Sequence, residues 1–155
     1  MMNSLPTAHQ HILDSFIRAF LPPRGNRRKT TRNELQRVHL TLHRVLQKYF
    51  GFGVTQQQVL TAFEKLGYAI FAKKGGWNAH KKDWIPSAKG EITRAGDTYE
   101  EYSAGFLYVD VEAGSIAQLW LATTTLPADT SPDKAHQREL LIERIHTFKQ
   151  VISGT

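Results

Sequence analysis

Apolar side chains recur every three or four residues in three stretches of the first half of the chain, residues 8–21, 32–49 and 55–66. This spacing places them on one face of a helix, so we predict three amphipathic helices. Pro22 and Pro23 end the first of these helices, because proline offers no backbone donor to continue it. The third helix follows the second after a short turn that contains two glycines.

Capping signals indicate where the second and third helices begin and end. Thr31 stands three residues before Glu34, the spacing of a capping box, so we expect the second helix to begin there. Thr55 is expected to cap the third helix, and Gly67 to end it as the residue that adopts the left-handed conformation.

The next stretch favours strands. Residues 68–73 are rich in β-branched and aromatic side chains, and the pattern resumes at Trp77 after two glycines. We predict a β-hairpin between residues 68 and 85 whose tip is basic and aromatic. Residues 87–104 are polar and contain several glycines and acids, which indicates a surface connection.

The second half of the chain predicts one strand and two helices. Residues 106–111 read as a strand, and Ser115 with Gln118 is expected to cap a short helix that carries Trp120 in its apolar set. Ser131 and Pro132 open a last helix. Its apolar stripe must be buried against the chain itself or against a second copy, and consists of Leu141, Ile145, Phe148 and Ile152.

The predicted fold class is therefore α+β, mainly helical with a short β-hairpin. A chain of 155 residues that is 41% hydrophobic suits a single domain with one core. No apolar run approaches the roughly 20 residues of a membrane span, and the start of the chain lacks the pattern of a signal peptide. We expect a soluble, cytoplasmic protein with no membrane partner. The absence of cysteine excludes disulfides, thiolate nucleophiles and cysteine-ligated metals.

Charge is segregated along the chain. Residues 1–90 carry 15 Lys and Arg against four acids, a net charge of +11, whereas residues 91–155 carry five against ten, a net charge of −5. Such asymmetry favours a half that faces a polyanion and a half that faces water or a partner. We place the basic part at about residues 8–86 and the acidic part at about residues 105–153.

The order of helix, basic arm, helix, tight turn, helix and hairpin resembles a winged helix-turn-helix over residues 8–86, and the run Leu66-Gly67-Tyr68 through Gly75-Gly76-Trp77 is the stretch most similar to that family. The resemblance implies that the helix after the turn enters the major groove of DNA. The chain is also loosely similar to small proteins of bacterial mobile elements, in Thr30-Thr31 before the second helix and in Gly67-Tyr68 where the strand region begins.

The resemblance, together with the basic surface, gives a set of candidate nucleic-acid contacts. Glutamine can offer a donor and an acceptor together to adenine, and lysine or arginine neutralises phosphates. The candidates are Arg27, Arg28, Lys29, Arg37, Arg44, Lys48, Gln57, Gln58, Thr61, Lys73, Lys74, Trp77, Lys81 and Lys82. Trp77 and Trp84 are alternatively core residues, or stacking platforms for single-stranded nucleic acid.

Enzymatic motifs are few. His39 and His43 have the spacing of two metal ligands on a helix but lack the glutamate of a zinc-protease motif. Asp110 and Glu112 would share a strand face, as nuclease acids do, without the expected lysine nearby. We therefore predict no catalytic residue, no metal site and no cofactor.

The leading hypothesis is a non-enzymatic nucleic-acid-binding protein, with DNA favoured over RNA. The first alternative is a protein-interaction module that self-associates through its C-terminal helix as a homodimer. The second alternative is a metal-dependent nuclease built on Asp110 and Glu112.

Overall fold

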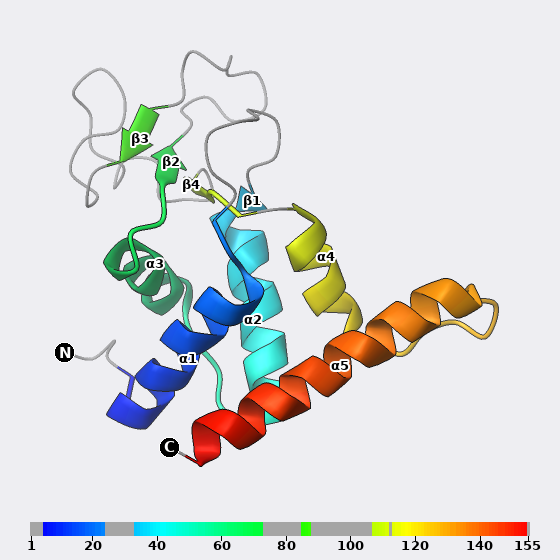
Figure 1. The fold of residues 1–155 in the computed structure, drawn as a ribbon. Coiled ribbons are helices and arrows are strands. Elements are labelled where there is room, and N and C mark those ends of the chain that lie inside the picture. The colour runs from blue at the N-terminus through cyan, green and yellow to red at the C-terminus, as the bar shows by residue number, and fades with distance from the viewer. Residues whose placement is uncertain (1–4, 24–32, 73–84, 88–106, 112, 155) are drawn as a thin grey trace.

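The computed structural model describes residues 5–23, 33–72, 85–87, 107–111 and 113–154. Within these residues the chain forms five helices and four strands of two or three residues each (Figure 1). The prediction of a mainly helical protein is therefore confirmed. The helices are α1 (Thr7–Phe20), α2 (Leu35–Phe50), α3 (Gln56–Lys65), α4 (Ala113–Leu121) and α5 (Pro132–Ser153). None of the helices in the described ranges is both long and apolar enough to cross a membrane.

The strands are β1 (Asn33–Glu34), β2 (Ile70–Ala72), β3 (Ile85–Ser87) and β4 (Leu107–Val109). They pair antiparallel in the order β1-β4-β2-β3, so that β2 lies between β3 and β4. A further bridge joins Pro23, after α1, to Val111, after β4. The small sheet thus connects the segments before α2, after α3 and before α4. The expected tip between β2 and β3 lies outside the described residues.

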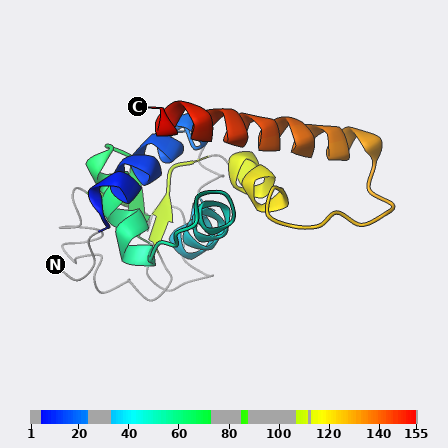
Figure 2. The same ribbon diagram turned by 90° about the horizontal axis from the view of Figure 1, so that it is seen from below.

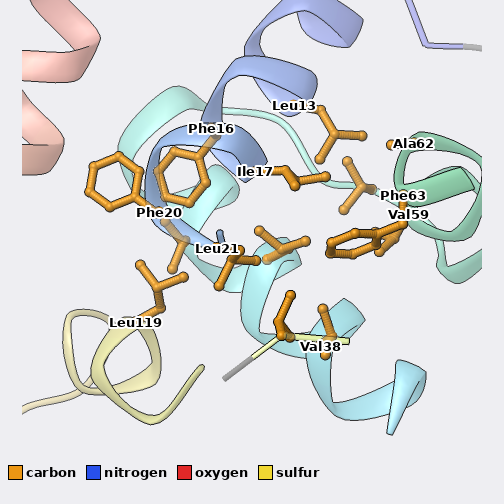
Figure 3. Close-up of a cluster of buried hydrophobic side chains, with 14 of the residues drawn as sticks. Leu13, Phe16, Ile17, Phe20, Leu21, Val38, Val59, Ala62, Phe63 and Leu119 are labelled. Carbon is orange, nitrogen blue, oxygen red and sulfur yellow. The ribbon is translucent and has the colours of Figure 1, made fainter. Parts of the chain in front are cut away.

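The core lies between α1, α2, α3 and α4, and residues of both the basic and the acidic half contribute to it. Figure 3 shows Leu13 and Ile17 of α1 directed toward Ala62 and Phe63 of α3, with Phe16 beside Phe20. The largest completely or almost completely buried side chains are Leu13, Phe16, Ile17, Leu21, Leu35, Leu42, Leu46, Phe63, Ile70, Ile116, Leu119 and Ile145. The predicted apolar faces of the first three helices are therefore the buried ones.

Two predicted capping boxes are wrong. Helix α2 begins at Leu35, and its N-cap Glu34 has an extended backbone without a side-chain cap, because Asn33 and Glu34 pair with β4 instead. Helix α4 begins at Ala113, which places Ser115 inside the helix rather than at its cap. In the first case strand pairing with a distant segment overrides the local capping signal.

The boundaries of α3 are those that the sequence predicts. Thr55 and Gln58 form a complete capping box, in which the Thr55 side chain accepts the Gln58 N–H and the Gln58 side chain accepts the Thr55 N–H. At the other end Gly67 has φ 86°, and Tyr68 N–H donates to the carbonyl of Phe63 at 3.0 Å. Such a left-handed residue strongly favours glycine.

Helix α5 begins at Pro132 with Ser131 as its N-cap, as predicted. Figures 1 and 2 show α5 as a long helix along one side of the molecule, with its first turns extending beyond α4. Leu141 and Ile145 are buried, and the Phe148 ring lies 5.6 Å from that of Phe16. Three residues of the predicted stripe, Leu141, Ile145 and Phe148, therefore pack against this chain's own core.

Candidate nucleic-acid interface

The outer face of α3 carries two of the three residues proposed to read bases. Gln57 and Thr61 are exposed, and the Gln57 Nε2 donates to Thr61 Oγ1 at 3.3 Å. Gln58 is half-buried, and its Oε1 accepts the Thr55 N–H at 2.9 Å. The amide oxygen of Gln58 is therefore used to cap the helix, whereas Gln57 and Thr61 present an amide and a hydroxyl to the surroundings.

Two histidines of α2 hold the turn that leads into α3. Val54 N–H lies 3.1 Å from His43 Nδ1 and donates to it. His39 Nε2 lies 2.8 Å from the Val54 carbonyl oxygen and donates to it. The two imidazoles thus bind both backbone groups of one residue. Among the residues that the structure describes, no group of three or more His, Asp or Glu is arranged to hold a metal ion.

Helix α1 also contacts α3 and the turn before it. Lys65 Nζ lies 2.6 Å from Asp14 Oδ2, and Gln10 Nε2 donates to Asp14 Oδ1 at 2.9 Å. The His9 ring stacks on Phe52 in the turn before α3, with 4.0 Å between ring centroids. Contacts from both α1 and α2 therefore fix the position of α3, as a surface that reads a rigid partner requires.

The predicted basic face of α2 is exposed, and one of its members is held in place. Arg44 Nε donates to Thr123 Oγ1 and its Nη2 to the Thr123 carbonyl, both at 3.2 Å. Its guanidinium also lies 4.4 Å from the centroid of the Trp120 ring on α4. Arg37 and Lys48 are exposed on the same flank of α2.

The structure does not bring the two described sets of candidates together. His39 and His43 contact the turn before α3, whereas Arg44 contacts α4. Figures 1 and 2 accordingly place α3 and α4 on opposite sides of α2. Gln57 and Thr61 thus belong to one surface, and the α2 cations belong to another.

The second surface contains two apolar residues that sequence reasoning did not select. Leu40 is 45% exposed and Trp120 is 37% exposed. The α4 helix is held against α2 there, because the buried Tyr49 hydroxyl donates to the Ala122 carbonyl at 2.8 Å. Burial raises the pKa of Tyr49 above 10.0, so this hydroxyl stays protonated at neutral pH.

The remaining candidates lie outside the described residues. They are Arg27, Arg28, Lys29, Lys73, Lys74, Trp77, Lys81 and Lys82, together with Trp84 and Glu112. Asp110, the other acid of the nuclease alternative, is described. It is only 6% exposed, and its N–H donates to the Ala69 carbonyl at 3.1 Å, so its position is not that of an acid in an open cleft.

Comparisons of this chain with models of protein families, with curated proteins and with solved structures found no match.

Proposed function

We propose that this protein binds DNA, with the outer face of α3 in the major groove. The observation that carries the proposal is the pairing of exposed Gln57 and Thr61 on a helix whose position is held by contacts from α1 and α2, in the half of the chain that has a net charge of +11. An amide and a hydroxyl suit base edges, and an excess of cations suits phosphates.

The arrangement of elements supports the same proposal. Helices α2 and α3 are consecutive and joined by five residues, and β2 and β3 follow them as an antiparallel pair. This is the order that the resemblance to winged helix-turn-helix proteins implies. With ten residues, α3 is about 15 Å long, which is enough to present several side chains along a groove.

Replacing Gln57 and Thr61 with alanine should erode sequence discrimination by about 1 to 3 kcal/mol per good contact and leave nonspecific affinity nearly unchanged. The physical reason is that base edges carry sequence information, whereas phosphates do not. The measurement is a selection of binding sites from random duplexes, followed by fluorescence anisotropy on the selected and a scrambled site. Both side chains are exposed, so the variant should fold as the parent does.

A matched control is Gln137→Ala with Thr147→Ala, which changes the same residue types at exposed positions of α5. This control should retain full discrimination. Equal discrimination by the α3 variant and by the control would contradict the placement of α3 in the major groove.

Affinity for duplex DNA should fall steeply between about 50 and 200 mM salt, because bound cations release the counterions of phosphates. Lys81→Ala with Lys82→Ala should flatten the slope of log K against log salt by up to about 0.9 for each contact removed. The same measurement on single-stranded DNA and RNA identifies the preferred nucleic acid.

The control for the salt series is Lys134→Ala with Lys149→Ala, which removes two exposed lysines from the acidic half of the chain. Its slope should equal that of the parent. A binding constant that does not respond to salt would argue against phosphate contacts altogether.

A further inference from the structure

A second surface, which we call the α2–α4 face, combines exposed apolar side chains with cations. It consists of Leu40 and Trp120 together with Arg37, Arg44 and Lys48. The face is concave in two adjoining places. One hollow is lined by Glu34, Gln36, Arg37, Leu40 and Trp120. The other is lined by His43, Arg44, Gln47, Lys48 and Thr123.

The charge of this face selects an anionic partner. Arg37, Arg44 and Lys48 stand against a single carboxylate, Glu34, among the residues that line the two hollows. The three cations lie on α2 at intervals of seven and four residues, so they extend for about 16 Å along the helix axis. Opposite charges across an interface guide association and exclude partners of the wrong sign.

The apolar residues favour a peptide over a nucleic acid. Nucleobases bind proteins by stacking on open aromatic faces. Here the Arg44 guanidinium already lies over the Trp120 ring at 4.4 Å, and the neighbouring exposed residue, Leu40, is aliphatic. Leu40 and the exposed part of Trp120 instead suit an apolar side chain of a partner, and tryptophan and arginine are the residues most enriched among strong interface contacts.

The side chain of Arg44 is already ordered in the unbound protein. Its two hydrogen bonds to Thr123 and its contact with Trp120 restrict its side chain before any partner arrives. Side chains that are already ordered lose less conformational entropy on binding.

We propose that the α2–α4 face docks an acidic segment of a partner protein. An apolar side chain of the segment lies on Leu40 and Trp120, and its carboxylates pair with Arg37 and Lys48. This role is separate from the DNA contacts of α3, because it depends on Arg37, Leu40 and Trp120 and not on Gln57 or Thr61.

The test uses the full chain and a displayed library of random twelve-residue peptides. Selection on the parent protein should enrich peptides in which aspartate or glutamate flanks leucine, phenylalanine or tryptophan. The strongest of these is then synthesised with a fluorescent label, and its affinity is measured by anisotropy. Leu40→Ser with Arg37→Glu should weaken that peptide at least tenfold, and Lys48→Glu should weaken it less.

Matched controls keep the test specific. Leu140→Ser with Arg18→Glu changes an equally exposed leucine on α5 and an exposed arginine on α1, and should leave peptide affinity within twofold of the parent. Circular dichroism on each variant checks that the fold is retained. Gln57→Ala with Thr61→Ala should also leave peptide affinity unchanged, so loss of DNA binding and loss of peptide binding are distinguishable.

Three results would overturn the proposal. Selection that enriches no acidic peptides is one, and an affinity that responds equally to the α2–α4 variant and to its control is another. The third is a protein that binds no peptide but does bind an oligothymidine of twelve nucleotides, and loses that binding in the variant Leu40→Ser with Arg37→Glu. The face would then be a site for single-stranded nucleic acid.

Discussion

Phe16→Ala should lower the free energy of unfolding by about 3 to 5 kcal/mol, because it leaves a cavity in the middle of the core. Phe16 is fully buried, and its ring lies 4.4 Å from Phe20, 6.0 Å from Phe50 and 5.6 Å from Phe148. It thus joins three helices, α1, α2 and α5. Urea denaturation followed by circular dichroism measures the loss, and Val151→Ala, at a position 64% exposed, should change stability by less than about 0.5 kcal/mol.

Urea denaturation of a second variant, together with sedimentation, decides whether the apolar stripe of α5 packs against its own chain or against a second copy in solution. Phe148→Ala should also destabilise the protein, and a double-mutant cycle with Phe16→Ala should give a coupling of about 0.5 to 1.5 kcal/mol for the edge-on ring pair. Sedimentation should give the same mass for parent and variant. If Phe148→Ala instead shifts a dimer to a monomer without lowering the monomer's stability, the stripe is an interface between copies.

Local patterns predicted the helices because the side chains that define them are close in sequence. The apolar spacing identified the buried faces of α1, α2 and α3, and Thr55 and Gly67 marked both ends of α3. The capping signal at Thr31 failed, because Asn33 and Glu34 pair with β4, more than 70 residues later in the chain. Strand pairing at such a distance leaves no mark in the local sequence.

In the candidate site, too, the sequence predicted features that depend on neighbouring residues and missed those that depend on distant ones. Exposure of Gln57 and Thr61 followed from helical spacing alone. The sequence could not show that Arg44 contacts Thr123, since 79 residues separate them. Trp120 was assigned to the apolar set of its helix, where Ile116 and Leu119 are indeed buried, yet Trp120 is 37% exposed. Whether one more apolar residue of a helix is covered depends on neighbours that only the fold supplies.

The role of His39 and His43 also required the structure. Their spacing of four residues is that of two metal ligands on a helix, whereas in the structure both rings bind the backbone of Val54. The sequence does show a glycine, Gly53, directly before Val54, and the contact of His43 with the turn explains why a residue without a side chain stands there. A Cβ on Gly53 would lie 2.3 Å from His43 Cε1, far inside van der Waals contact.

Gly53→Ala should therefore destabilise the protein by about 1 to 3 kcal/mol, the usual cost of overpacking. The backbone of Gly53 is not left-handed, so the clash with His43 is the cause rather than strain at φ. In a His43→Ala background, Gly53→Ala should cost less than about 0.5 kcal/mol, because the ring is gone and the remaining close atom, Gln47 Oε1 at 3.2 Å, is the end of a flexible side chain. Thermal denaturation of the four proteins of this cycle measures both costs.

Gly51→Ala is the matched control, since Gly51 has φ 81° and nothing lies within 4 Å of an added Cβ. Its cost of about 1 to 2 kcal/mol comes from the left-handed backbone and should be the same with and without His43. Equal costs of Gly53→Ala in both backgrounds would mean that His43 does not pack against the turn. If the histidine contact does position α3, Gly53→Ala should also reduce sequence discrimination on DNA while nonspecific affinity stays nearly constant.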